Sequence, residues 1–374
     1  MMNILIILPN LKGGGAEKLA VDLALRWSEM GHCVAFVLFN AEGVYLDSLP
    51  PEITVYNLKS KRFKSSILKL SYFFKTYKPN VIWANMWPIT SISVIAWLIT
   101  LCKGRLILTD HIHLSTEAKY NLNLNYFLLK LIIFLTYPIA SNRTAVSNGA
   151  SEDLRKLLYP LRTSVNVINN CVSPSPKHFI IEDNCFPDLW SNFTGKKIIS
   201  VGNLKKQKNH KLLIEAFSIL NNRCDAILAI LGEGELRSYL ESYAEEIGIS
   251  EKVLMPGFVK DLSPWYKDAD LFVLSSEWEG FGNVLIEALS HGLPIVSTDC
   301  DSGPAEILEN GLYGSLVKVN DPIALSDSMY NSLQVLHDKS KLIKRSEVFS
   351  VVNIADQYLR LFKDSSCMPE DING

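Results

Sequence analysis

The chain has 374 residues, more than one hydrophobic core normally serves, so its length predicts two domains. Hydrophobic residues make up 48% of it, as is typical of a globular protein, and its seven scattered cysteines lack the Cys-x-x-Cys pairs of a structural zinc site. The net charge of −2 conceals a basic part, residues 1–170, which has 18 Lys and Arg against 10 Asp and Glu.

Apolar strand-like runs alternate with helical patterns along the chain. The first run, NILIILP, has no basic lead-in and is too short for a signal peptide, so we expect a cytoplasmic protein. The other runs are CVAFVLF, NVIWAN, RLILTD, RTAVS and SVNVIN, followed in the second half by KIISVGN, DAILAILG, KVLMPGF, DLFVLSS and LPIVSTD. This alternation predicts an α/β protein whose parallel sheets are covered by helices.

Three glycines, Gly13 to Gly15, follow the first predicted strand and precede a helical pattern. They lack the G-x-G-x-x-G spacing of a dinucleotide site, and no clean ribose-binding acid follows about 20 residues later. The pattern is therefore weak evidence for a dinucleotide, whereas the approach of a sugar or a phosphate to this turn stays open.

The segment from Lys59 to Lys78 carries seven cations and no acid, with apolar and aromatic side chains between them. Two interpretations are equally open, a helix on the inner face of an anionic membrane and a solvated helix packed on a sheet. Nucleic acid is disfavoured, because no known binding module accompanies the basic residues. Two apolar stretches, 89–101 and 126–140, are shorter than the roughly 20 residues of a membrane span, so we expect buried helices.

The run LILTDHIHLST places Asp110, His111 and His113 at the end of a predicted strand. A lone histidine is more often structural, but two beside an aspartate at a carboxyl end leave a role in a ligand cleft equally open.

Residues 172–193 are rich in Pro, Asn and Ser and lack periodicity, so they form the predicted linker. The linker separates predicted domains 1–171 and 194–348. Each should be doubly wound, with ligands at the carboxyl ends of its strands and hence in the cleft between the domains. The last helical pattern, at about residues 349–364, should pack back on the first domain.

In the second half, Lys205, Lys206 and Lys208 gather after one predicted strand, where lysines can neutralise a pyrophosphate. A further strand-to-helix turn contains Gly232 and Gly234.

The segment from Ser275 to Leu308 reads as a strand, the loop EWEGFG and the helix NVLIEALSHG. A helix N-terminus beside glycines favours phosphate, and Glu279 and Glu287 on its two sides can accept hydrogen bonds from paired hydroxyls. A nucleotide sugar has this layout; the alternative is two ordinary surface glutamates at a helix cap. Asp-x-Asp pairs at 268–270 and 299–301 are short enough to arise by chance, so we predict no metal site.

Together these residues resemble the retaining glycosyltransferases of the GT-B fold, specifically family 4 of the bacterial surface-polysaccharide type. The likeness is strongest from Ile198 to Val319, where VGNLKKQKNHKLLIEAF, LGEGEL, SSEWEGFGNVLIEALSHGLPIVSTD and GPAEIL run in the family's order. The motifs GGGAEKLA and AVSNGASEDL match more loosely. The resemblance implies two Rossmann-like domains facing across a cleft, the first binding the acceptor and the second the nucleotide sugar.

The resemblance also implies catalytic roles for Glu279, Lys208 and His111. Glu279 would hold hydroxyls of the donor sugar, Lys208 a phosphate, and His111 would lie near the sugar's reacting end, with His113 in reserve. Glu287 would hold the ribose hydroxyls. The other implied donor-binding positions are Gly14, Gly15, Asn203, Lys206, Gly232, Phe258, Val259, Gly280, Phe281, Gly282, Asn283 and Val284.

The chain departs from the family pattern at Asn203, where an arginine usually joins the lysine at the diphosphate. Lys205 and Lys206 are candidate substitutes.

The implied reaction moves a hexose or N-acetylhexosamine from a UDP-sugar to a glycan or lipid-linked acceptor, with retention and without a metal or other cofactor. The departing diphosphate would assist deprotonation of the acceptor. Two alternatives remain: a sugar-nucleotide epimerase or hydrolase of the same fold, and an inactive nucleotide-sugar-binding subunit, to which the missing arginine lends weight.

Overall fold

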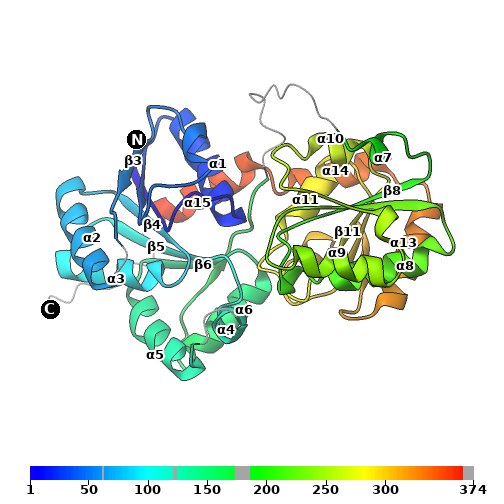
Figure 1. The fold of residues 1–374 in the computed structure, drawn as a ribbon. Helices are drawn as coiled ribbons and strands as arrows, with labels where there is room; N and C mark the ends of the chain where they lie inside the picture. Colours follow the sequence, from blue (N-terminus) through cyan, green and yellow to red (C-terminus); the bar gives the residue numbers. More distant parts are fainter. Residues whose placement is uncertain (61–62, 121–123, 173–185, 365–374) are drawn as a thin grey trace. The chain divides into compact units, whose positions relative to one another are not determined.

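The computed structural model describes residues 1–60, 63–120, 124–172 and 186–364, and the chain forms two compact units (Figure 1). Unit 1 comprises Met1–Val172 and Ser350–Gly374, and unit 2 comprises Ser173–Phe349. Most of the predicted linker, residues 173–185, lies outside the described residues. Its last part belongs to unit 2, because helix α7 (Asp188–Ser191) buries Trp190 against Trp265, with ring centroids 5.0 Å apart.

Unit 1 is built on a seven-stranded parallel sheet in the order β3-β2-β1-β4-β5-β6-β7. The central strands are almost wholly buried, which explains why they read as continuous apolar runs. The edge strand β3 escaped prediction because it is short and half-exposed. The strands are β1 (Asn3–Leu8), β2 (Cys33–Leu38), β3 (Thr54–Asn57), β4 (Val81–Asn85), β5 (Arg105–Asp110), β6 (Asn142–Ala145) and β7 (Asn166–Val167).

Helices cover both faces of this sheet. One face carries an apolar cluster that includes Leu70, Phe74, Ile92 and Ile133, and the other carries a cluster centred on Trp27. The helices are α1 (Gly15–Glu29), α2 (Phe63–Tyr77), α3 (Ile89–Thr100), α4 (Leu114–Tyr120), α5 (Tyr126–Thr136), α6 (Asn148–Leu158) and α15 (Val351–Lys363), with the short 3-10 helices η1 (Leu46–Ser48) and η2 (Tyr137–Ile139).

The C-terminal helix α15 belongs to unit 1 and packs beside α1. Trp27 Nε1 donates a hydrogen bond of 3.3 Å to the carbonyl of Ala355, and the rings of Tyr358 and Phe362 lie 6.1 and 5.2 Å from the Trp27 ring. A cluster of aromatic rings therefore holds the chain's last helix on its first domain.

Unit 2 contains a six-stranded parallel sheet in the order β10-β9-β8-β11-β12-β13. Its edge strand β13 also escaped prediction, for the same reason as β3. The strands are β8 (Lys196–Val201), β9 (Ala226–Leu231), β10 (Val253–Gly257), β11 (Leu271–Leu274), β12 (Ile295–Thr298) and β13 (Ser315–Val317). Besides α7, the helices are η3 (Lys206–Lys208), α8 (His210–Asn221), α9 (Arg237–Glu246), η4 (Ser250–Lys252), α10 (Ser263–Asp268), α11 (Asn283–Ser290), α12 (Pro304–Ile307), α13 (Pro322–Gln334) and α14 (Lys339–Glu347).

Both sheets are doubly wound with the same strand order. In each unit the first strand lies in the middle and the order reverses beside it, between β1 and β4 in unit 1 and between β8 and β11 in unit 2. Ligands of such sheets bind at this reversal, outside the carboxyl ends of the strands. The α/β class and the two Rossmann-like domains are confirmed.

The apolar stretches 89–101 and 126–140 contribute α3 and α5. Among the described residues, no helix combines the length and apolarity that a membrane span requires. The prediction of buried helices is wrong for the outer sides of both helices, because α5 exposes Phe127 and Leu131 and α3 exposes Leu98 and Ile99. Basic helix α2 packs on the sheet through Leu70 and Phe74, although Lys61 and Arg62 lie outside the described residues.

Candidate active site

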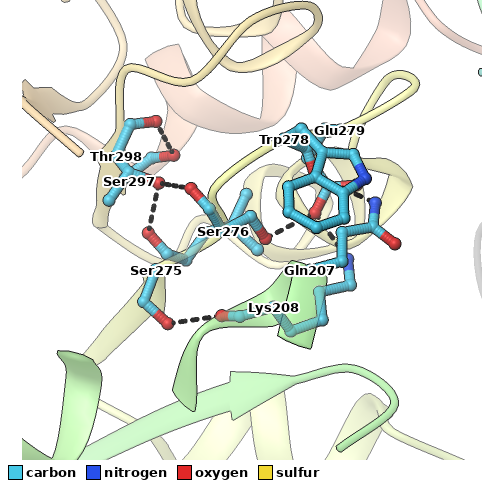
Figure 2. Close-up of polar contacts among 9 residues, drawn as sticks. Gln207, Lys208, Ser275, Ser276, Trp278, Glu279, Ser297 and Thr298 are labelled. Carbon is cyan, nitrogen blue, oxygen red and sulfur yellow. Dashed lines mark hydrogen bonds and ion pairs between the residues drawn. The ribbon is translucent and has the colours of Figure 1, made fainter. Parts of the chain in front are cut away.

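Two loops meet at the strand reversal of unit 2, one after β8 and one after β11 (Figure 2). Ser275 Oγ donates a 2.9 Å hydrogen bond to the Lys208 carbonyl, and Gln207 Nε2 donates one of 2.9 Å to the Trp278 carbonyl. The Glu277 amide donates to the Gln207 carbonyl at 2.9 Å. These bonds fix the two loops to each other, so side chains on both are held in one place.

The loops bring Lys208 and Glu279 together as an ion pair. Lys208 Nζ lies 2.6 Å from Glu279 Oε1, and Ser276 Oγ donates to the same oxygen at 2.6 Å. The Ser276 carbonyl is held in turn by Thr298 Oγ1 at 2.7 Å. The side chains of Lys208 and Glu279 are only 14% and 6% exposed, so each charge depends on the other for compensation.

One glycine makes room for this lysine, and a second makes room for the backbone of the first. A Cβ at Gly202 would lie 3.0 Å from Lys208 Cε, and a Cβ at Gly232, where φ is 151°, would lie 2.1 Å from the Gly202 carbonyl oxygen. Gly232 is thus required by the close approach of two backbones. Its predicted contact with the donor stays a prediction.

Helix α11 begins directly after the loop that carries Glu279. Its N-cap is Gly282, in the left-handed region at φ 99°, and provides no capping side chain, so the positive end of the helix dipole follows the loop. The loop is backed by Gly303, where a Cβ would lie 1.8 Å from the Phe281 carbonyl oxygen. The Phe281 side chain is 2% exposed and packs on Phe349. The side chain of Phe281 belongs to the core, so its predicted contact with the donor would be made by its backbone and stays a prediction.

Glu287 lies on α11 and has a different partner from Glu279. Tyr266 Oη donates to Glu287 Oε2 at 3.1 Å, and the Tyr266 ring stacks on His291 with centroids 5.1 Å apart. Burial, followed by the nearby Glu287 charge, raises the pKa of Tyr266 well above its usual value, so the phenol remains a donor. Sequence reasoning missed Tyr266, since nothing in SPWYKDAD marks this tyrosine.

Of the remaining predicted donor-binding residues of unit 2, Gly280 lies in the loop before α11, Asn283 and Val284 begin that helix, and the others lie after β8 and β10. Asn203, Lys206 and Phe258 are exposed, Phe258 by 66%, and Val259 is partly buried. An exposed phenylalanine at the carboxyl end of a strand offers a flat apolar surface to a ring.

In unit 1, helix α1 begins at Gly15 with Gly14 as its N-cap. A Cβ at Gly14 would lie 2.2 Å from Glu17 Oε2, so the glycine leaves room for this carboxylate over the helix start. Burial raises the pKa of Glu17. Glu17 was not predicted as a site residue, because an acid in the first turn of a helix is also common as a simple capping charge.

His111 follows β5 and is held by Asn85 at the end of β4. Asn85 Nδ2 donates to the Trp83 carbonyl at 3.2 Å, which turns Asn85 Oδ1 toward His111 Nε2 at 2.9 Å. Because an amide oxygen only accepts, Nε2 carries the proton and Nδ1 is left as the acceptor. Burial lowers the pKa of His111 to about 4, so the ring is neutral near pH 7.

The neighbours of His111 are engaged in the fold. Tyr137 Oη donates to Asp110 Oδ1 at 3.0 Å, and burial raises the pKa of Asp110 to about 7. His113 Nδ1 lies 3.0 Å from Thr116 Oγ1 and 3.5 Å from Asp153 Oδ2. His113 therefore connects α4 to α6, whereas His111 is placed at the carboxyl end of β5.

The Asp-x-Asp pair before β11 is structural. Asp268 Oδ2 accepts from Trp190 Nε1 at 2.8 Å and from Lys197 Nζ at 2.9 Å, and Asp270 Oδ2 accepts from the Lys197 amide at 2.8 Å. Within residues 1–60, 63–120, 124–172 and 186–364, no three His, Cys, Asp or Glu side chains cluster as metal ligands would.

Comparison with known proteins identifies the family. The model "Glycosyl transferases group 1" matches residues 186–347, and the model "Glycosyltransferase Family 4" matches residues 13–175. A Campylobacter jejuni protein, "N-acetylgalactosamine-N,N'-diacetylbacillosaminyl-diphospho-undecaprenol 4-alpha-N-acetylgalactosaminyltransferase", is 32% identical over 267 residues, 69% of each chain. The chain belongs to glycosyltransferase family 4.

A second Campylobacter jejuni relative of this glycosyltransferase, "GalNAc-alpha-(1->4)-GalNAc-alpha-(1->3)-diNAcBac-PP-undecaprenol alpha-1,4-N-acetyl-D-galactosaminyltransferase", is 26% identical and covers 97% of the chain and 99% of its own length. Two solved structures support the GT-B fold. The Anabaena protein Alr3699/HepE with UDP and glucose has a TM-score of 0.77 at 21% identity, covering 96% of this chain and 99% of its own. The galactosyltransferase WaaB has a TM-score of 0.72 at 20% identity, covering 96% and 98%.

Proposed function

We propose that this glycosyltransferase moves an N-acetylhexosamine or hexose from a UDP-sugar to a lipid-linked glycan during surface polysaccharide assembly, with retention of the anomeric configuration. The names of the two Campylobacter relatives support an N-acetylhexosamine and a diphospho-undecaprenol acceptor. The HepE structure with UDP and glucose supports a UDP-sugar donor.

The observation that carries the proposal is the Lys208–Glu279 pair at the strand reversal of unit 2, directly before the N-terminus of α11. We assign the diphosphate to this helix start and to Lys208. Both supply positive charge in a place where Lys208 is largely shielded from water, which strengthens their attraction for a leaving diphosphate. The proposed reaction accordingly requires no metal.

Glu279 and Glu287 accept hydrogen bonds from hydroxyl groups of the donor on the two sides of its diphosphate. Glu279, fixed by Lys208 and Ser276, accepts from hydroxyls of the donor sugar, and Glu287, fixed by Tyr266, accepts from the ribose. Phe258 and Val259 provide the surface for the base. When the bond from C1 to the phosphate oxygen breaks, the acceptor oxygen bonds to C1 on the same face, and its proton passes to the departing phosphate.

Unit 1 receives the acceptor, and we place neutral His111 near the reacting end of the sugar. Its Nδ1 is buried, has no hydrogen-bond partner among the described residues and can only accept a hydrogen bond, because Asn85 fixes the proton on Nε2. His111 therefore orients a sugar hydroxyl without adding a charge to the transition state.

The test is UDP release from UDP-GalNAc, UDP-GlcNAc, UDP-glucose and UDP-galactose, with and without a bacterial polyprenyl-diphosphate glycan extract, and with EDTA throughout. We expect release that depends on the extract, and a product whose anomeric proton coupling in NMR matches the donor's. Lys208→Gln should abolish release, while Lys211→Gln, a half-exposed lysine of α8 that pairs with Glu215, serves as the matched control.

Release that never depends on the acceptor would indicate a hydrolase. Absence of nucleotide binding in calorimetry would contradict a donor site altogether. A reaction that EDTA stops would overturn metal independence.

A further inference from the structure

The outer surfaces of three helices in unit 1 are apolar where water-facing helices are normally polar. Exposed apolar side chains recur at helical spacing, so each helix presents one apolar stripe to solvent besides its buried stripe. We call this set the apolar layer: Leu68 and Tyr72 on α2, Ile95, Leu98, Ile99 and Leu101 on or after α3, and Tyr126, Phe127, Leu128, Leu131 and Leu135 on α5. Phe127 is 78% exposed and Leu101 82%.

These helices lie side by side over one face of the unit 1 sheet, so their exposed stripes belong to one surface. Helix α3 packs against both α2 and α5, and residues of all three contribute to the same buried cluster beneath them. Figure 1 shows them together on one side of unit 1. The opposite face is covered by α1 and α15.

The charged residues of α2 and α5 are all lysines and α3 has none, whereas α4 and α6, which contact α5, carry Glu117 and Glu152. Residues 53–109 contain nine Lys and Arg and no Asp or Glu, and the sequence of α5 contains Lys130 and no acid. A pocket of about 530 Å³ opens between the C-terminal ends of α2 and α3, lined by Lys75, Lys78 and Lys103 and by the exposed Leu101. These three lysines and Leu101 therefore line one pocket, to which residues 53–109 contribute no carboxylate.

We propose that the apolar layer binds the surface of an anionic lipid bilayer, with lipid phosphate groups in the three-lysine pocket and the side chains of α3 and α5 in the acyl region. A bilayer offers a dense negative charge directly above hydrocarbon, which is the complement of this surface. The proposal places the membrane contact mainly on α3 and α5, because α2 contributes only Leu68 and Tyr72 to the apolar layer.

The test uses the full-length protein and vesicles of POPC alone or of POPC with 40% POPG, in a flotation assay at low and high salt. We expect binding to the POPG vesicles only, weakened by salt. Phe127→Ser with Leu131→Ser removes two apolar contacts, and Lys75→Gln with Lys78→Gln and Lys103→Gln removes the pocket's charge. Each variant should lower the vesicle partition constant at least about tenfold, since one lysine near an anionic surface raises that constant by a factor of about five and the burial of apolar side chains in the acyl region raises it further.

Matched controls lie on unit 2. Ile323→Ser with Leu336→Ser removes two exposed apolar side chains, and Lys267→Gln with Lys318→Gln and Lys344→Gln removes three exposed charges. Both controls should float as the wild type does. All substituted side chains are exposed, so circular dichroism should report unchanged folding.

Wild-type protein that fails to float with POPG vesicles, or Phe127 and Leu131 substitutions that leave flotation unchanged, would overturn the proposal. A wild-type dimer in light scattering that becomes monomeric in the Phe127 and Leu131 variant, without a change in flotation, would assign the surface to a second copy instead. The assay contains no nucleotide sugar, so its failure leaves the proposed transfer reaction untouched.

Discussion

The first six strands of the two sheets follow one order, but the side chains at the point where that order reverses differ between the two units. In unit 2 the reversal holds a charged pair, Lys208 and Glu279, beside the start of α11. In unit 1 the Glu17 carboxylate lies over the start of α1, and burial raises its pKa. Neutral His111, which follows β5, is hydrogen-bonded to Asn85 at the end of β4. The same topology therefore places a buried ion pair at the reversal in one unit and a neutral histidine hydrogen-bonded to an amide beside it in the other.

Removing the cation of unit 2 should have the largest effect. Lys208→Gln leaves Glu279 buried without its counter-charge, so we expect transfer to fall about a thousandfold and unit 2 to lose roughly 3 kcal/mol of stability. Acceptor-dependent UDP release and urea unfolding measure the two effects. Lys211→Gln should change neither, and equal losses in both variants would show that Lys208 has no special place.

The two glutamates should separate catalysis from binding. Glu279→Gln removes a negative charge from the proposed contact with the donor sugar, so the rate of transfer should fall about a hundredfold. Lys208 stays available to the phosphate, so the UDP dissociation constant should stay within about threefold of the wild-type value. Glu287→Gln should instead weaken UDP about tenfold, because charged acceptors make the stronger hydrogen bonds. Calorimetry with UDP decides, and identical affinity losses in the two variants would contradict the assignment.

The raised pKa of Asp110 in unit 1 should make the free energy of unfolding depend on pH. The pKa of Asp110 is raised from 3.8 to about 7, so the folded state binds more protons than the unfolded state between these values, and stability falls as pH rises through this range. Between pH 5 and 8 the wild type should lose about 3 kcal/mol relative to Asp110→Asn.

His111 titrates in the opposite sense. Its pKa is lowered to about 4, so its contribution is present above about pH 6.5 and is lost as pH falls toward 4. Both proteins contain His111, so the difference between their unfolding free energies isolates Asp110. A difference that does not change with pH would show that Asp110 titrates normally.

Asn85 should act on the reaction through the tautomer of His111. Asn85→Leu removes the acceptor of the Nε2 proton, so we expect kcat to fall about tenfold with the donor KM nearly unchanged. Nitrogen chemical shifts of His111 in NMR should show the proton on Nε2 in the wild type and a mixture in the variant. A wild-type spectrum with the proton on Nδ1 would refute this arrangement.

Restoring the family's arginine should have the smallest effect. Asn203 is exposed after β8, so Asn203→Arg adds a solvent-screened cation near the proposed diphosphate and should tighten UDP about threefold to fivefold. Asn203→Ala should leave the UDP dissociation constant unchanged. Weaker binding of UDP by the arginine variant would place the diphosphate away from this loop.

Much of the fold followed from the sequence because buried parallel strands are apolar runs. The short edge strands β3 and β13 were missed because each is half-exposed and therefore carries no continuous apolar signal. Helices α3 and α5 were both misread as buried, since a helix that is apolar on its inner and its outer side has the same composition as a core helix.

The site was predictable as a set of residues but not as a set of contacts. Lys208 and Glu279 were each marked by a local motif, yet they are 71 positions apart, and only the meeting of two loops shows that they pair. Tyr266 and Asn85 escaped because they support Glu287 and His111 from other elements, 21 and 26 positions away. Such partners depend on tertiary arrangement and leave no spacing in the sequence.

The central claim is that unit 2 provides the charged reversal point that binds the nucleotide. A crystal structure of the protein with UDP tests it most directly. We predict the diphosphate at the N-terminus of α11 within hydrogen-bonding distance of Lys208 Nζ, and the ribose hydroxyls on Glu287. A diphosphate bound only at Gly13 to Gly15 of unit 1, away from Lys208 and α11, would contradict the account.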